Sequence, residues 1–150
     1  MYMKKYPYLL KWVNVVFEFE SIGRKGLIKK IIEYQTRTFL GEDVVNLALG
    51  DWNEERRYAE DDITSNNGDT NMVLATVAST CVEMMSLHPT IRVLAEGATP
   101  ARNRLYQIGI VKNWSEIELT ADVDGLRFGK WEPFQPNVGY SAFRAKRKQK

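Results

Sequence analysis

The sequence predicts a single α+β domain, in which an antiparallel-rich mixed sheet packs against two main helices. Two observations predict this class. Apolar residues alternate with period two before residue 53 and after residue 116, and two segments with helical apolar spacing lie between these stretches. At 150 residues the chain has the usual size of one domain, and no linker divides it. We therefore expect one globular domain over residues 1–143 and a basic tail over residues 144–150.

The first third of the chain predicts a three-stranded meander. Segment 13–22 alternates phenylalanine with glutamate, which is typical of a half-buried strand. A turn with two glycines at 23–26 joins it to a second strand at 27–38. A third strand follows at 44–52 and places three apolar side chains on the core face: Val45, Leu47 and Leu49.

A polar connection and a long helix come next. Segment 53–62 predicts an exposed turn that leads to a short strand near Ile63. Asp69 or Thr70 has the side chain to cap a helix over residues 71–87, which ends at a histidine-proline pair. Its apolar stripe is formed by Leu74, Val77, Ala78, Cys81, Met84 and Met85.

The segment 91–97 predicts a strand, and a shorter helix follows it. Thr99 is the expected N-cap, and Pro100 occupies the first helical position, where its missing N–H costs nothing. We expect the helix to extend to Ile108. Hydropathy places Ala101, Leu105 and Ile108 inward and leaves Arg102, Asn103 and Tyr106 on the outer face.

The last third of the chain predicts a further hairpin. Alternation over 117–123 indicates a strand. Two turns compete to follow it, one at Asp124-Gly125 and one at Phe128-Gly129. Pro133 and Pro136 are expected to close this part of the sheet.

The start of the shorter helix is the candidate binding site. A strand that ends at a helix N-terminus presents free N–H groups and a positive dipole end, which favour an anion such as phosphate or carboxylate. Thr99, Arg102 and Arg104 belong to this site, and both arginines add positive charge to it.

The pair Leu105-Tyr106, on a short helix that follows a long helix and a strand, resembles the GCN5-related N-acetyltransferases over roughly residues 44–130. In that family a glycine-rich loop at the long helix binds the pyrophosphate of acetyl-CoA, and a tyrosine protonates the departing thiolate. The resemblance implies acetyl-CoA as cofactor, the Gly68 loop as pyrophosphate seat and Tyr106 as catalytic general acid. Glu96 or Asp51 is then the candidate base.

A second resemblance rests on the string Thr-Pro-Ala-Arg-x-Arg-Leu-Tyr at 99–106, with Asn-Asn-Gly-Asp before it and Trp-Glu-Pro-Phe after it. The chain is similar in these motifs to a family of small bacterial proteins of unknown function. This resemblance implies that five residues share one site, namely Asn67, Gly68, Arg102, Arg104 and Tyr106. The alternative is that they form a loop, a cap and a helix face.

Other chemistry is not indicated by the composition or spacing. Cys81 is the single cysteine, which excludes an intramolecular disulfide and makes a cytoplasmic location the simplest interpretation. His88 is the single histidine and no acidic spacing matches a calcium loop, so we expect no metal site. No stretch approaches the ~20 apolar residues of a membrane span, so we expect no membrane association.

Two functions follow. The first is a non-catalytic binding or regulatory module that holds a protein or nucleic-acid partner. Its contact surface is the Arg102 and Tyr106 face, the small polar face of the helix at 71–87, or the basic tail. The alternative is an acyl-CoA-dependent N-acetyltransferase with Tyr106 as general acid. The binding module ranks first because the loop 67–72 contains one glycine, and because Asp69 would repel phosphate.

Overall fold

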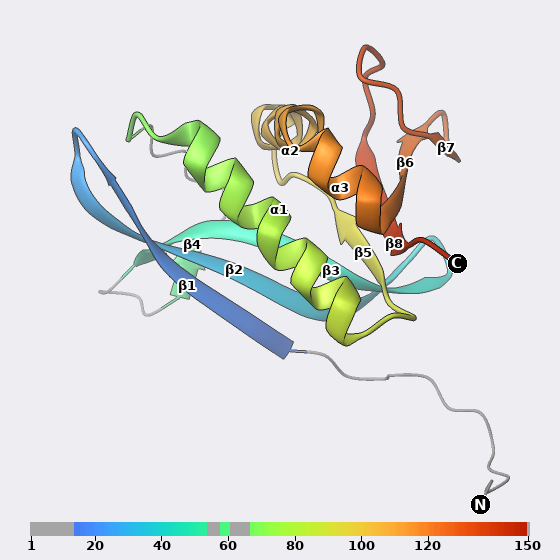
Figure 1. Ribbon diagram of the computed structural model, residues 1–150, viewed down its shortest axis with the longest axis horizontal. Coiled ribbons are helices and arrows are strands. Elements are labelled where there is room, and N and C mark those ends of the chain that lie inside the picture. The colour runs from blue at the N-terminus through green and yellow to red at the C-terminus, as the bar shows by residue number, and fades with distance from the viewer. Residues whose placement is uncertain (1–13, 54–57, 61–66, 150) are drawn as a thin grey trace, which may run out of the picture.

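The computed structural model describes residues 14–53, 58–60 and 67–149, and it confirms a single α+β domain (Figure 1). The described strands are β1 (Asn14–Gly23), β2 (Gly26–Phe39), β3 (Glu42–Asn53), β4 (Tyr58–Glu60), β5 (Arg92–Ala95), β6 (Ala121–Arg127), β7 (Lys130–Pro133) and β8 (Ala142–Arg147). The described helices are α1 (Thr70–Leu87), α2 (Pro100–Lys112) and α3 (Trp114–Thr120). All of these described strands join one mixed, mostly antiparallel sheet in the order β1-β2-β3-β5-β8-β6-β7, with β4 paired to β3.

The predicted meander is confirmed. β1, β2 and β3 pair antiparallel, and the inward residues Val45, Leu47 and Leu49 of β3 are buried. β3 runs beyond its predicted end and pairs with β4, which takes up part of the segment expected to be a turn. The short strand expected near Ile63 lies outside the described residues.

Helix α1 lies across the strands of the meander (Figure 1), and its predicted apolar stripe faces the core. Leu74, Val77, Ala78, Met84 and Met85 are buried there. Burial of an aliphatic or methionine side chain of this kind contributes ~1.5–3 kcal/mol of transfer free energy. The stripe therefore attaches α1 to the sheet.

Strand β8 corrects the expected end of the domain. It lies between β5 and β6 and pairs antiparallel with both. Phe143 and Ala145 pack in the main core, whereas Arg144 and Lys146 alternate with them on the other face. Residues 144–147 therefore belong to the sheet rather than to a tail. Their basic side chains hid this in the sequence, because a strand can bury one face and keep charged residues on the other.

The strand expected over residues 117–123 is wrong in its first half. Residues 114–120 form helix α3, and the strand begins only at Ala121. Ile117 is buried in the core, but Leu119 is 83% exposed. The two residues therefore do not share a buried sheet face, and their spacing of two carried no information about a strand.

Of the two competing turns, the one at Phe128-Gly129 is formed. These residues have φ values of 54° and 75° and connect Arg127 to Lys130, as a tight hairpin turn requires. Gly125 lies inside β6 instead. A Cβ atom at Gly125 would come within 2.3 Å of the Tyr140 ring, so the missing side chain serves packing rather than a turn.

Candidate functional site

The parallel strands β3 and β5 separate near the middle of the sheet. They pair only from Val45 and Val93 to Leu47 and Ala95, where β5 ends. β3 continues, and the same edge of β3 meets β4 only from Asp51 onward. In the described part of the chain, β3 thus has no neighbouring strand on this edge between these two pairings. Ligands commonly bind where parallel strands end and diverge.

Tyr106 of α2 fills this gap. The backbone N–H of Leu49, which points out of the open edge of β3, donates a hydrogen bond to the Tyr106 hydroxyl at 3.3 Å. The side chain therefore takes the place that a strand would occupy, and its ring belongs to the main core. Tyr106 is only 6% exposed.

The orientation of α2 is opposite to the predicted one. Its buried residues are Arg102, Tyr106 and Gly109, whereas Ala101 and Ile108 are exposed. The physical reason is the approach of α2 to α1: a Cβ atom at position 109 would stand 3.3 Å from Leu74. The glycine face gives the closest contact between the helices, so packing outweighed the hydropathy of the two apolar side chains.

A polar cavity of about 210 Å³ lies in the gap between β3 and β5. Its wall contains two guanidinium groups and one carboxylate, a formal excess of one positive charge. Arg37 donates to the Glu96 carboxylate at 3.0 Å and to Asn46 Oδ1 at 3.0 Å. The lining residues are Arg37, Asn46, Ala48, Glu96, Gly97, Ala98, Arg102 and Tyr106.

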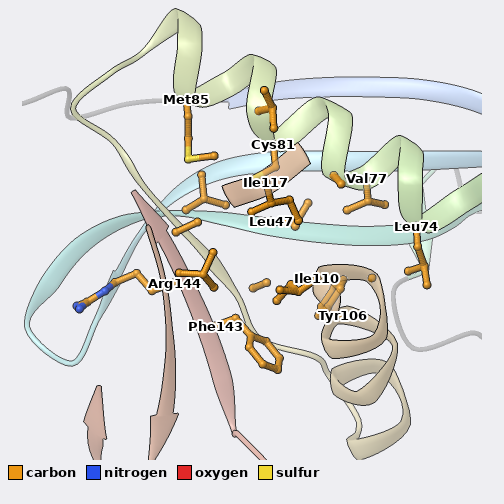
Figure 2. A pocket seen from close by; sticks show the side chains of 17 residues that line it. Leu47, Leu74, Val77, Cys81, Met85, Tyr106, Ile110, Ile117, Phe143 and Arg144 are labelled. Carbon is orange, nitrogen blue, oxygen red and sulfur yellow. The ribbon is translucent and has the colours of Figure 1, made fainter. Parts of the chain in front are cut away.

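An apolar cavity of about 70 Å³ lies on the helix side of the same gap (Figure 2). Figure 2 shows side chains of α1, among them Leu74, Val77 and Cys81, gathered around it with Tyr106 of α2. Burial raises the pKa of the Cys81 thiol to about 12, so the thiol is neutral at physiological pH. This agrees with a core cysteine rather than a nucleophile.

Asn67 and Gly68 lie at the β1–β2 turn. The Asn67 side-chain amide donates to the carbonyls of Ser21 and Gly26, and its Oδ1 accepts from the Lys25 N–H at 2.7 Å. Asn67 is 2% exposed, while Gly68 is exposed beside the side chain of Arg24. The hydrogen bonds of the Asn67 side chain thus join the approach to α1 to the hairpin, and neither residue is among those that line the polar cavity.

The side-chain cap expected from Asp69 is not formed. Asp69 occupies the N-cap position of α1, but its side chain makes no capping bond and accepts from Ser21 Oγ at 2.7 Å. At the start of α2, by contrast, the Thr99 hydroxyl accepts from the Arg102 N–H at 3.1 Å, as predicted. The long-range bond to β1 was invisible in the local sequence.

The remaining candidate residues divide between the cavity and other places. Glu96 lines the polar cavity with Tyr106, whereas Asp51 forms an ion pair with Lys30 at 2.5 Å. Arg104 is exposed on α2 and is not among the cavity-lining residues. Across the described ranges, no cluster of three histidine, cysteine or acidic side chains could hold a metal ion.

Arg144 of β8 is matched by acidic neighbours on the face of the sheet away from α1. Arg144 contacts Glu42 at 3.2 Å and Asp124 at 2.9 Å, and its guanidinium lies 4.4 Å from the Trp131 ring centroid. Arg92 pairs with Glu42 as well. This face of the sheet therefore presents mixed charges rather than the uniformly basic surface that binds nucleic acid.

Arg37 and Asn46 were missed in the sequence analysis. Asn46 stands between the buried residues Val45 and Leu47, and Arg37 lies in a polar stretch of β2 with no buried neighbour in sequence. Both patterns are those of an ordinary solvent-facing side chain. Only the end of β5 and the packing of α2 make these positions part of a cavity. No local signal in the sequence distinguishes them.

The fold and the cavity define the chain as a small α+β protein with one mixed sheet and a polar cavity between two diverging parallel strands. Residues 2–148 match the model of a family of unknown function, DUF6934, and the chain belongs to this family. No curated protein and no solved structure matches it. None of the helices in the described part combines the length and apolar character needed to cross a bilayer.

Proposed function

We propose that the protein is a binding module whose ligand is a small anion, held in the polar cavity between β3 and β5. The observation that carries this proposal is the burial of Arg102, which is 5% exposed and lines the cavity. A guanidinium group presents a planar set of donors that matches a carboxylate or a phosphate. The ligand class is therefore an anion with two or more oxygens on one atom.

The ion pair of Arg37 and Glu96 supports an exchangeable site. Their side chains are 42% and 34% exposed, so this pair stabilises the protein by about 1 kcal/mol or less. An incoming carboxylate can replace Glu96 as the partner of Arg37 at little cost. Glu96 then acts as an internal competitor that weakens anion binding.

The test is a thermal titration of the purified protein with acetate and, separately, with phosphate at constant ionic strength. A ligand present at one hundred times its Kd stabilises the native state by ~2.7 kcal/mol, which raises Tm by several degrees. We expect Arg102→Met to remove this rise. Arg104→Met is the matched control, because Arg104 lies on the same helix but is exposed.

Two further variants keep the test decisive if Arg102→Met does not fold. Arg37→Met, at a partly exposed position, should weaken binding, and Glu96→Gln should strengthen it by removing the competing carboxylate. An absent Tm rise with both anions would overturn the proposal. So would an equal rise in wild type and Arg37→Met.

A second candidate function is an acyl-CoA-dependent N-acetyltransferase, and one specific observation favours it. Tyr106 and Glu96, the candidate acid and base, line the same cavity. Against it, the Asn67 side chain is engaged by the β1–β2 turn, and the Asp69 carboxylate stands at the α1 N-terminus where a pyrophosphate would bind. Titration with acetyl-CoA decides: no Tm shift at millimolar ligand would exclude this function.

A protein or nucleic-acid partner receives less support than a small ligand. The Arg102 and Tyr106 side chains, expected on an outer face, are buried. Arg144, expected in a free basic tail, is ion-paired within the sheet. A salt-dependent mobility shift with nucleic acid would contradict this order of preference.

A further inference from the structure

The polar cavity and the apolar cavity meet at one side chain. Tyr106 lines both of them. On β3, Leu47 lines the apolar cavity while its neighbours Asn46 and Ala48 line the polar one. The two cavities thus lie on opposite faces of the sheet at the same level.

The sheet backbone does not separate the cavities at this level. β5 ends at Ala95, which lines the apolar cavity, and the next residue, Glu96, lines the polar one. Beyond this point the space beside β3 is occupied by Tyr106, whose hydroxyl accepts from Leu49 N–H at 3.3 Å. Tyr106 is therefore the one side chain that the wall of the cationic cavity and the wall of the apolar cavity share.

We infer that the ligand is a short aliphatic carboxylate, with its carboxylate beside Arg37 and Arg102 and its chain in the apolar cavity behind Tyr106. This inference rests on the proposed function and names its ligand class. The apolar cavity of about 70 Å³ is roughly half the size of the ~150 Å³ cavity that accepts benzene, so it has room for about three carbon atoms. Butyrate has this length.

The experiment measures Kd for acetate, propionate, butyrate and hexanoate by calorimetry and Tm shift. Each methylene that enters the apolar cavity should tighten Kd about fourfold, the factor that ~0.8 kcal/mol represents at 25 °C. We expect the gain to continue to butyrate and to stop or reverse at hexanoate.

Two cavity variants test where the chain lies. Ala78→Val narrows the apolar cavity and should abolish the gain with chain length while leaving acetate binding intact. Val77→Ala enlarges it and should move the preferred chain toward hexanoate. The second variant remains informative if the first is too crowded to fold.

The outcomes separate this inference from the proposed function. If neither acetate nor phosphate binds, the proposed function itself fails. If phosphate binds and acetate does not, the polar anion site stands and the carboxylate assignment is overturned. If acetate binds but Kd is the same for all four acids, the polar site stands and the chain assignment is overturned. A gain with chain length that persists in Ala78→Val would also overturn it, because the chain would then lie elsewhere.

Discussion

Asn67 connects two parts of the fold through one buried side chain. Its amide donates to the Ser21 and Gly26 carbonyls, and its Oδ1 accepts from the Lys25 N–H, so the β1–β2 turn and the approach to α1 are held together. A buried amide that loses such partners costs ~1–3 kcal/mol. Asn67 thus stabilises the hairpin through its side-chain hydrogen bonds.

The contact between Gly23 and Asn67 makes the first prediction. A Cβ atom at Gly23 would stand 1.7 Å from the Asn67 carbonyl oxygen, so Gly23→Ala must displace backbone. We expect it to lower the free energy of unfolding by about 2–3 kcal/mol, measured by urea denaturation.

Gly139→Ala is the control for this prediction. A Cβ atom at Gly139 meets nothing within 4 Å, and its φ is not positive, so the change should stay within about 0.5 kcal/mol. Equal stability of the two variants would show that the turn does not approach Asn67 as closely as described.

At the scale of elements, α2 and β8 show the same effect of packing. Each presents to the core a face that its own sequence does not mark as apolar: Arg102, Tyr106 and Gly109 on α2, and alternate residues of a basic run on β8. Strand β8 pairs with one edge of β5 and with one edge of β6. A short C-terminal segment therefore completes the centre of the sheet.

Truncation of the chain tests the role of β8. A chain that ends at Ser141 lacks the whole strand, leaves β5 and β6 unpaired with each other, and should show no cooperative melting by circular dichroism. A chain that ends at Arg147 keeps β8 and should melt within about 4 °C of the full chain, as expected for a loss of about 1 kcal/mol. Cooperative melting of both chains would assign residues 142–147 to a dispensable tail.

At the scale of the whole molecule, burial keeps one thiol and two phenol groups in their neutral, protonated forms. Burial is the main cause that raises the pKa of Cys81, Tyr34 and Tyr140 above their usual values. In each case the unfolded chain releases its proton at a lower pH than the folded protein does. Below the pKa of the unfolded chain these groups are protonated in both states, and the free energy of unfolding has its full value. As pH rises from that pKa toward the pKa of the folded protein, the free energy of unfolding falls.

This linkage predicts a loss of stability in alkali that begins near pH 9. The Cys81 thiol has a pKa of about 12 when folded, against 9.0 without the protein environment, so between pH 9 and 10 it is the first of the three groups to contribute. We expect the free energy of unfolding to fall by at most ~1.4 kcal/mol per pH unit from this group. Urea denaturation of wild type and Cys81→Ala at pH 8, 9 and 10 measures it. The same slope in both proteins would contradict the assignment.

The sequence by itself determined the α+β class, the meander, the limits and stripe of α1, and the capped start of α2. These features depend on period, turn residues and caps within a few neighbouring positions, which are local physical signals.

Only the tertiary structure decided what surrounds Tyr106. The inward turn of Arg102 follows from the close approach of α2 to α1 at Gly109, the insertion of β8 follows from the free edges of β5 and β6, and the cavity exists because β5 stops at Ala95 while β3 continues. Each depends on contacts between segments far apart in the chain. Local hydropathy does not predict such contacts, because a strand that faces solvent and a strand that lines a polar cavity can have the same pattern of polar residues.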